Sequence, residues 1–300
     1  MTAIEGTPAV QEHVRATVGS SRAGGRYAPR WVRRLGNGLL NGWAVVAYVY
    51  LFAPIVVIVI FSFNNLNGIT HPFNYTWRGF TFSNWAHPFG KFPELGRAMV
   101  ESLKIAFIAS LVATVMGSLV AIALSRYRFR GGAVVNLLLV LPLTTPEICL
   151  GSSLLTLFLT RGVALGFVTI LIAHIMFCVS FVALTVKARI RGFDWTLEDA
   201  AMDLGAPPLR TFRKVTMPLI MPGVIAAFML SFSLSIDDYI ITVFNAGNTV
   251  TFPIQIFTEQ KIAVPPQIDV LASMILFVSI ALIGGGTAFR LLRENRLRST

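Results

Sequence analysis

Residues 197–218 read LEDAAMDLGAPPLRTFRKVTMP, a polar segment in a chain that otherwise consists of long apolar runs. The segment is punctuated by Gly205, Pro207, Pro208 and Pro218. Small and apolar residues recur at helical spacing before Gly205, so the first half predicts a short helix. A folded polar loop between hydrophobic spans indicates a surface that contacts a partner.

The ends of these helices can be predicted from capping chemistry. Thr196 is a good N-cap residue, and Asp199, three residues later, approximates a capping box. Gly205 stands where a left-handed glycine stops a helix. The pair of prolines that follows suits the first turn of a second short helix, which Pro218 is expected to end. An amphipathic helix on the lipid surface is the alternative, but the first helix has few large apolar residues.

The composition indicates an integral membrane protein. Of the 300 residues, 55% are hydrophobic and 13% are charged, whereas soluble domains carry about 25% charged residues. The net charge of +11 does not indicate nucleic-acid binding, because the basic residues lie between apolar spans and not on one solvated face. Cys149, Cys178 and His174 lie within apolar runs without neighbours at metal-ligand spacing, so no metal site is predicted, and His174 is expected to be packed or hydrogen-bonded.

Six apolar runs are long enough to cross a bilayer, which takes about 20 residues. They predict an all-α membrane protein with six transmembrane helices. The third run is broken by Pro142 and Pro146. The runs cover about residues 40–63, 98–124, 133–159, 163–186, 222–244 and 270–289.

The basic residues set the expected orientation. Nineteen of the 25 Lys and Arg residues lie in the two tails, the second-to-third connection and the fourth-to-fifth loop, whereas five lie on the opposite side and Lys104 lies within a span. Because basic residues concentrate on the cytoplasmic side, both termini and the polar loop are expected to be cytoplasmic. The expected parts are a basic disordered tail at 1–38, a six-helix domain at 39–291 with its cytoplasmic loop at 187–218, and a cytoplasmic tail at 292–300.

The polar loop resembles the EAA loop of permease subunits in ATP-binding-cassette (ABC) importers. That pattern is Glu-Ala-Ala, three residues, Gly, and a basic stretch that ends in Leu-Pro. Here it reads Asp199-Ala200-Ala201, Gly205 and Met217-Pro218, with Asp in place of Glu and Met in place of Leu. Segments 123–131, 141–155 and 232–239 are similar to the second intracellular junction of the family and to the third and fifth spans of spermidine/putrescine permeases. The likeness extends from about residue 40 to the C-terminus.

The resemblance implies a type I ABC importer permease (MetI-like) architecture in the bacterial inner membrane. It also implies that the loop forms coupling helices that sit in a cleft of a separate ATPase. The residues that it assigns to this contact are Glu198, Asp199, Ala200, Ala201, Gly205 and Pro218.

The implied partners are ABC ATPase subunits, a second permease subunit in a heterodimer, a periplasmic solute-binding protein and the lipid bilayer. No phosphate-binding Gly-x-x-x-x-Gly-Lys-Ser/Thr motif occurs in the sequence, so we expect no catalytic residues and no cofactor, with ATP bound by the partner.

Charged residues inside spans cost roughly 2.5–3.5 kcal/mol each on insertion scales and mark functional positions. Glu101 and Lys104 are three residues apart and can pair with each other. Glu147 follows a proline in mid-span, where freed carbonyls must face protein or a water-filled cavity, a setting that suits a cation with several N–H donors. Asp237 and Asp238 diverge by about 100° on a helix, so one can face a pathway while the other caps or pairs.

Glu147, Asp237 and Asp238 are therefore the candidate pathway residues, with a buried ion pair to a partner's Arg or Lys as the alternative role. The expected function is a translocation pathway for a polyamine such as putrescine or spermidine. An alternative is a permease for another small solute, such as an opine, an amino-acid derivative or an anion. A self-contained secondary carrier predicts inverted repeats, which are not evident, and a membrane-embedded enzyme lacks a cluster of suitable side chains.

Overall fold

The computed structural model describes residues 30–66, 73–88, 93–127, 129–261, 264–278 and 280–281, with side chains from residue 38 onward. These residues contain no β-strand, only two isolated bridges that join Asn64 to Phe80 and Phe73 to Val264. The chain forms two compact units, Met1–Val57 and Ile58–Thr300. The C-terminal tail and most of the N-terminal tail lie outside the described residues.

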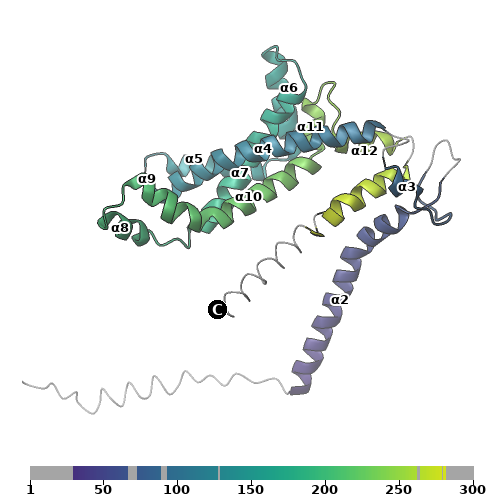
Figure 1. The fold of residues 1–300 in the computed structure, drawn as a ribbon, viewed down its shortest axis with the longest axis horizontal. Coiled ribbons are helices and arrows are strands. Elements are labelled where there is room, and N and C mark those ends of the chain that lie inside the picture. Colours follow the sequence, from purple (N-terminus) through teal and green to yellow (C-terminus); the bar gives the residue numbers. More distant parts are fainter. Residues whose placement is uncertain are drawn as a thin grey trace, which may run out of the picture. The chain divides into compact units, whose positions relative to one another are not determined.

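The regular secondary structure of the described residues is helical (Figure 1). The first unit contributes most of one long helix, which begins inside the segment expected to be a tail. The helices are α2 (Arg30–Phe61), α3 (Ser83–Ala86), α4 (Pro93–Arg126), α5 (Gly132–Thr144), α6 (Glu147–Thr160), α7 (Phe167–Ile190), α8 (Thr196–Asp203), α9 (Pro208–Thr211), a π-helical turn η1 (Phe212–Thr216), α10 (Met217–Asp237), α11 (Ile240–Asn245) and α12 (Phe252–Glu259).

Four helical stretches within the described residues are long and apolar enough to cross a membrane: Gly38–Phe61, α4, α7 and Pro208–Asp237. The pair formed by α5 and α6 is bent by 107° and adds a fifth if it is one broken span. The sixth predicted span begins in a shorter apolar helix, Pro266–Val278. The end of that predicted span lies outside the described residues.

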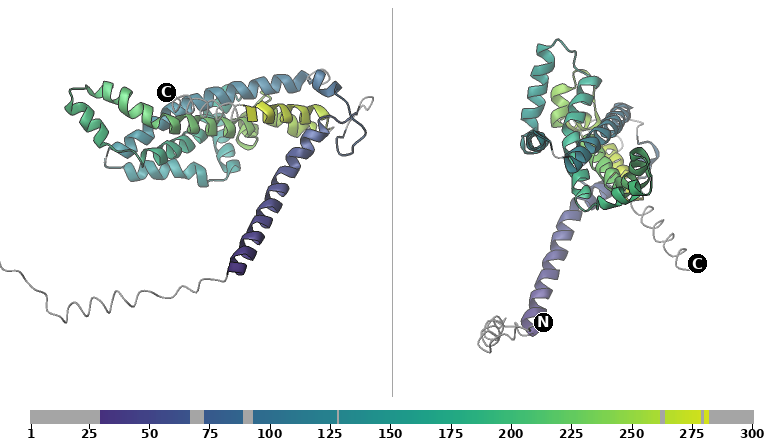
Figure 2. Two further views of the ribbon diagram at one scale, coloured as in Figure 1. Left: turned by 60° about the horizontal axis from the view of Figure 1, so that its bottom comes forward. Right: turned by 90° about the vertical axis from the view of Figure 1, so that its left-hand side faces the viewer.

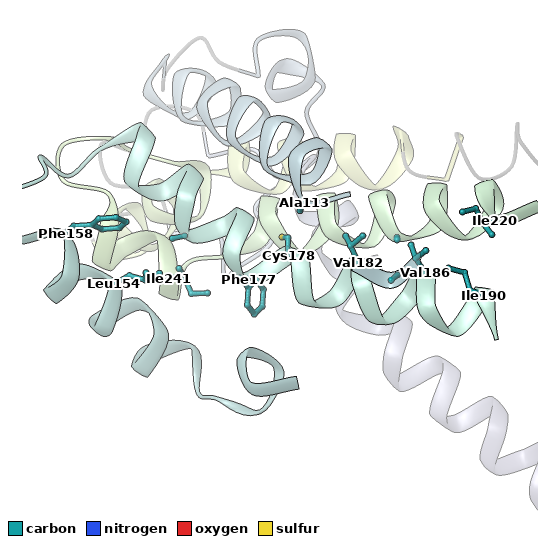
Figure 3. Close-up of a cluster of buried hydrophobic side chains, with 13 residues drawn as sticks. Ala113, Leu154, Phe158, Phe177, Cys178, Val182, Val186, Ile190, Ile220 and Ile241 are labelled. Carbon is teal, nitrogen blue, oxygen red and sulfur yellow. The ribbon is translucent and has the colours of Figure 1, made fainter. Parts of the chain in front are cut away.

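In the second unit, α4 and α10 pack against α7 and against each other, as the views in Figure 2 also show. The main hydrophobic cluster runs along α7 through Phe177, Val182, Val186 and Ile190 (Figure 3). Small residues on α4 allow this close packing. A Cβ atom on Gly117 would lie 2.7 Å from Cγ1 of Val182, which shows how near the two helices approach.

The break between α5 and α6 lies at the predicted Pro146, and Glu147 is the first residue after it, at the start of α6. Thr145 is extended, with ψ of 132°, because a residue before proline is driven out of the helical region. Pro146 also lacks the N–H that would continue the helix. Pro142, in contrast, is accommodated within α5.

In the loop at residues 187–218, called the coupling loop after its expected role, the start of the first helix is capped differently from the prediction. Thr196 is the first residue of α8, and the residue before it, Trp195, makes no side-chain capping bond. The carboxylate of Asp194 instead accepts a hydrogen bond from the N–H of Thr196 at 3.0 Å, which serves the same need for an acceptor. Gly205 ends the helix as predicted, with φ of +84°.

The predicted role of Pro218 as a helix end is wrong. α9 begins at Pro208, as predicted, but continues through η1 into α10, so that Pro218 lies in the first turn of α10. A proline lacks an N–H and its ring clashes with the carbonyl four residues earlier, and a wider π-helical turn at this place relieves both problems. The fifth span therefore begins well before its predicted start at residue 222.

Candidate functional site

The end of α10 separates the two adjacent aspartates. Asp237 is the last residue of the helix, and Asp238 is extended, with ψ of 119°. The side chain of Asp238 turns into the protein and is only 5% exposed. Its carboxylate accepts a hydrogen bond from the N–H of Thr242 at 2.8 Å and a longer one from the N–H of Ile241 at 3.4 Å, so it caps the first turn of α11.

A buried histidine completes the surroundings of Asp238. His174, on α7, places Nε2 at 3.3 Å from the Asp238 carboxylate and at 2.8 Å from the hydroxyl of Thr242. Its Nδ1 lies 2.7 Å from the hydroxyl of Ser235 on α10. The expectation that His174 is hydrogen-bonded is confirmed. These contacts join α7, α10 and α11, and they indicate that Asp238 has a structural role.

Asp237 is exposed and borders a cavity of about 540 Å³. The rings of Tyr239 and Phe257, on its wall, lie 4.6 Å apart between centroids. Asp237 is the one acidic side chain among the described residues that line the cavity. The lining consists of Ser233, Ile236, Asp237, Tyr239, Phe252, Pro253, Ile256, Phe257, Gln260 and Ile275.

Glu147 joins this acidic region from a different helix. Its exposed carboxylate lies near enough to both Asp237 and Asp238 to interact with them electrostatically. Within the described part of the chain, neither Glu147 nor Asp237 takes part in a salt bridge. Glu147 thus lies within reach of the charges of both aspartates but outside the cavity lining, and neither Glu147 nor Asp237 has a cation among the described residues. Glu101, by comparison, pairs with Lys104 at 2.8 Å.

The coupling loop lies at the opposite end of the α4–α7–α10 bundle from α11 and α12 (Figure 1). Its tip exposes two leucines that no neighbour covers, Leu204 at 90% and Leu209 at 79%. Asp199 and Ala200 are exposed as well, and Ala201 is half-buried. Side chains of this kind can contact another protein.

Glu198 differs from the other residues assigned to this loop because it is only 2% exposed. Its carboxylate pairs with Arg126 at the end of α4, at 2.6 Å, and accepts a hydrogen bond from the hydroxyl of Thr216. Glu198 therefore contacts the rest of the chain and has no surface to offer a partner. No sequence pattern singles out Arg126 or the rings of Tyr239 and Phe257, because only the folded chain brings them to these sites.

The described residues contain no group of three or more His, Cys, Asp or Glu side chains that could hold a metal ion. The geometry combines an acidic, aromatic-lined region at one end of a helical bundle with an exposed apolar tip at the other. Such an arrangement fits passage of a solute and contact with a driving partner.

Comparison with known proteins assigns the chain to a family. The family model described as "Binding-protein-dependent transport system inner membrane component" matches residues 113–298. The spermidine/putrescine transport system permease protein PotC of Haemophilus influenzae is 38% identical over 246 residues, which cover 82% of this chain and 93% of that protein. The putrescine transport system permease protein PotI of Escherichia coli K12 is 35% identical over 246 residues, which cover 78% and 85%.

Two solved structures share the fold at low sequence identity. One is a bacterial ABC transporter involved in the import of the acidic polysaccharide alginate, with a TM-score of 0.63 at 14% identity over 87% of this chain and 98% of that chain. The other is the MetNI methionine ABC transporter in an inward-facing conformation, with a TM-score of 0.54 at 19% identity over 65% and 94%. The chain therefore belongs to the family of inner membrane components of binding-protein-dependent transport systems, as a multi-pass permease subunit of an ABC importer.

Proposed function

We propose that this chain forms part of the translocation pathway for a polyamine such as putrescine or spermidine. The observation that carries the proposal is the unpaired carboxylate of Asp237 on the wall of an aromatic-lined cavity, with a second unpaired carboxylate, that of Glu147, within reach of its charge. A polyamine carries ammonium groups, which bind carboxylates through charge-assisted hydrogen bonds. The faces of Tyr239 and Phe257 add a surface for methylene groups or for a cation. The names of the relatives, PotC and PotI, support the same solute class.

Another solute remains the second candidate within the same family. An opine or an amino-acid derivative also carries an ammonium group, but its own carboxylate would face Glu147 and Asp237. An anionic solute would also be repelled by Glu147 and Asp237, and it has no ammonium group to offset that repulsion. The acidic region therefore favours a solute that is wholly cationic over both alternatives.

We infer that α8 and α9 dock on a separate ATPase subunit, because Leu204 and Leu209 form an exposed apolar tip there. Apolar side chains that protrude in this way are common at the centres of protein interfaces. Asp199, Ala200, Ala201 and Gly205 belong to the same surface, whereas Glu198 is buried behind it and Pro218 lies in the first turn of α10. The complete subunit then has six membrane helices with both termini in the cytoplasm, as its distribution of basic residues predicts.

The assembly that we propose contains a second permease subunit, two ATPase subunits that bind ATP, and a periplasmic solute-binding protein. ATP binding closes the ATPase dimer, and α8 and α9 convert that closure into opening of the pathway on alternate sides. This chain supplies no ATPase site of its own.

The test is uptake of labelled putrescine by the complete complex in proteoliposomes. Glu147→Gln is expected to lower uptake about tenfold, because a hydrogen bond to a charged group contributes about 1.5–3 kcal/mol. Glu101→Gln is the matched control, since that carboxylate already pairs with Lys104, and it should leave uptake near the wild-type rate. Co-purification of the ATPase with each variant checks assembly. Full uptake by Glu147→Gln would remove this residue from the pathway.

A further inference from the structure

We propose that the buried Glu198 and its partner Arg126 form a latch that makes α4 and α10 move together with the helix α8. The proposal rests on the function proposed above, in which α8 and α9 dock on an ATPase. It adds a positioning role for Glu198, whose carboxylate does not reach the docking surface. The latch is defined here as Arg126, Glu198 and Thr216.

The two oxygens of the Glu198 carboxylate are held by two different membrane helices. Oε2 lies 2.6 Å from Nη1 of Arg126, the last residue of α4. Oε1 accepts a hydrogen bond from the hydroxyl of Thr216, the last residue of η1, immediately before α10 begins. The side chain of Glu198 is 3% exposed and that of Arg126 is 33% exposed, so the carboxylate is shielded from water while the guanidinium keeps part of its hydration. One carboxylate on α8 thus fastens the cytoplasmic ends of both helices.

Arg126 has a second contact that fixes its direction. Its guanidinium group lies over the ring of Trp195, 5.6 Å from the centroid. Trp195 stands directly before α8, its ring lies 4.7 Å from that of Phe193, and both rings pack on the main hydrophobic cluster. The guanidinium is thereby held between a carboxylate within α8 and an aromatic ring at its start. The guanidinium group of Arg126 is therefore restricted to few orientations.

The two helices that the latch joins both lead to the acidic cavity. α10 carries Asp237 at its far end. α4 has 34 residues, which corresponds to about 50 Å at a rise of 1.5 Å per residue. Near its other end, the hydroxyl of Ser102 on α4 accepts a hydrogen bond at 2.9 Å from the N–H of Phe252, at the start of α12. Phe252 lines the cavity that Asp237 borders.

These contacts give a continuous physical connection between the docking surface and the cavity. A displacement of α8 moves Glu198, and the two contacts of Glu198 transmit that displacement to both α4 and α10. α10 acts on Asp237, while α4 acts through α12 on Phe252, another residue of the cavity lining. Rigid helices joined by fixed polar contacts are the kind of network that carries coupling between distant sites.

The latch is tested in the complete complex of both permease subunits, the ATPase and the binding protein, reconstituted in proteoliposomes. Glu198→Gln removes the charge at nearly constant size. Asp203→Asn is the matched control, because Asp203 is an exposed acid on the same helix. The measurements are the affinity of the ATPase for the permease, and the number of putrescine molecules imported per ATP hydrolysed.

Glu198→Gln is expected to leave ATPase affinity within about twofold of wild type and to lower import per ATP about tenfold, within the usual range of coupling between sites. Arg126→Gln should lower import per ATP to a similar extent, and the double variant should fall no further, because both changes open the same latch. Asp203→Asn should match wild type. If Glu198→Gln does not assemble, Thr216→Val decides, since it removes one hydroxyl and should lower import per ATP several-fold.

Unchanged import per ATP in Glu198→Gln or in Thr216→Val overturns the latch. A loss of ATPase affinity in Glu198→Gln equal to that in Leu204→Asp also overturns it, because Glu198 then only shapes the docking surface. The proposed docking fails separately, if Leu204→Asp binds the ATPase as well as wild type does. If the wild-type complex imports no putrescine, the proposed solute is wrong, and stimulation of ATP hydrolysis by the loaded binding protein replaces import as the measure of coupling.

Discussion

Asp237 and Asp238 are adjacent in sequence, but the same substitution is expected to affect different properties at the two positions. Replacement of Asp238 should lower stability, and replacement of Asp237 should lower uptake. Asp238→Ala removes the acceptor for the N–H groups at the start of α11 and the partner of His174. Loss of a helix cap costs about 1 kcal/mol, and loss of a hydrogen bond to a charged group about 1.5–3 kcal/mol, so the variant should lose about 2–4 kcal/mol of stability. Asp237→Ala removes an exposed side chain and should change stability by no more than about 0.5 kcal/mol.

The assay pairs thermal unfolding of the purified subunit in detergent with uptake of labelled putrescine by the complete complex. Asp238→Ala should lower the unfolding midpoint by several degrees. Asp237→Ala should keep the wild-type midpoint and lose at least about tenfold in uptake, the effect of one charge-assisted contact. Equal destabilisation by both substitutions would refute the division of roles. Full uptake by Asp237→Ala would refute its place in the pathway, whatever its stability.

Two further predictions test the packing and the loop between α2 and α4. Gly117→Ala should lower the unfolding midpoint, because its Cβ would lie 2.7 Å from Val182 and overpacking costs about 1–3 kcal/mol. The control Gly42→Ala has open space around its Cβ and should leave the midpoint unchanged or raise it, since alanine favours a helix by about 1 kcal/mol. Asn74→Asp should also destabilise, because Asn74 donates to Asp269 at 2.6 Å and two carboxylates would then meet. That loss should shrink as the pH falls, since protonation of either carboxyl restores a donor, and it should persist at low pH if the reasoning is wrong.

Features that depend on neighbours in sequence were predictable. Gly205 ends α8 because a left-handed position there suits glycine, and Pro208 begins α9 because the first turn does not need its N–H. The predictions that were wrong concern positions where two local backbone arrangements are both possible. Pro218 was expected to end a helix, but a π-helical turn before it lets the helix continue. Thr196 was expected to cap α8, but Asp194 supplies the acceptor.

The direction in which a side chain points depends on contacts between distant segments and was less predictable. Helical geometry implied that Asp237 and Asp238 diverge, yet the choice between them depends on where His174 lies on α7. The sequence likewise placed Glu198 in the coupling loop, but its burial follows from Arg126 at the end of α4. Neither pairing leaves a periodic signal in the sequence, because each joins residues from separate helices.

The acidic residues of this chain divide into carboxylates that are paired and carboxylates that are not, and the proposed pathway rests on the unpaired ones. Asp238 and Glu198 lie at opposite ends of the bundle, yet each is buried and held by a cationic or ring-nitrogen group and by threonine. Glu147 and Asp237 have no cation within the described structure, although their mutual repulsion makes one favourable. In the proposed pathway a transported polyamine supplies that cation only transiently, so the site must stay uncompensated between cycles. The paired carboxylates have the opposite requirement, since they must hold α4, α8, α10 and α11 in place while the solute passes.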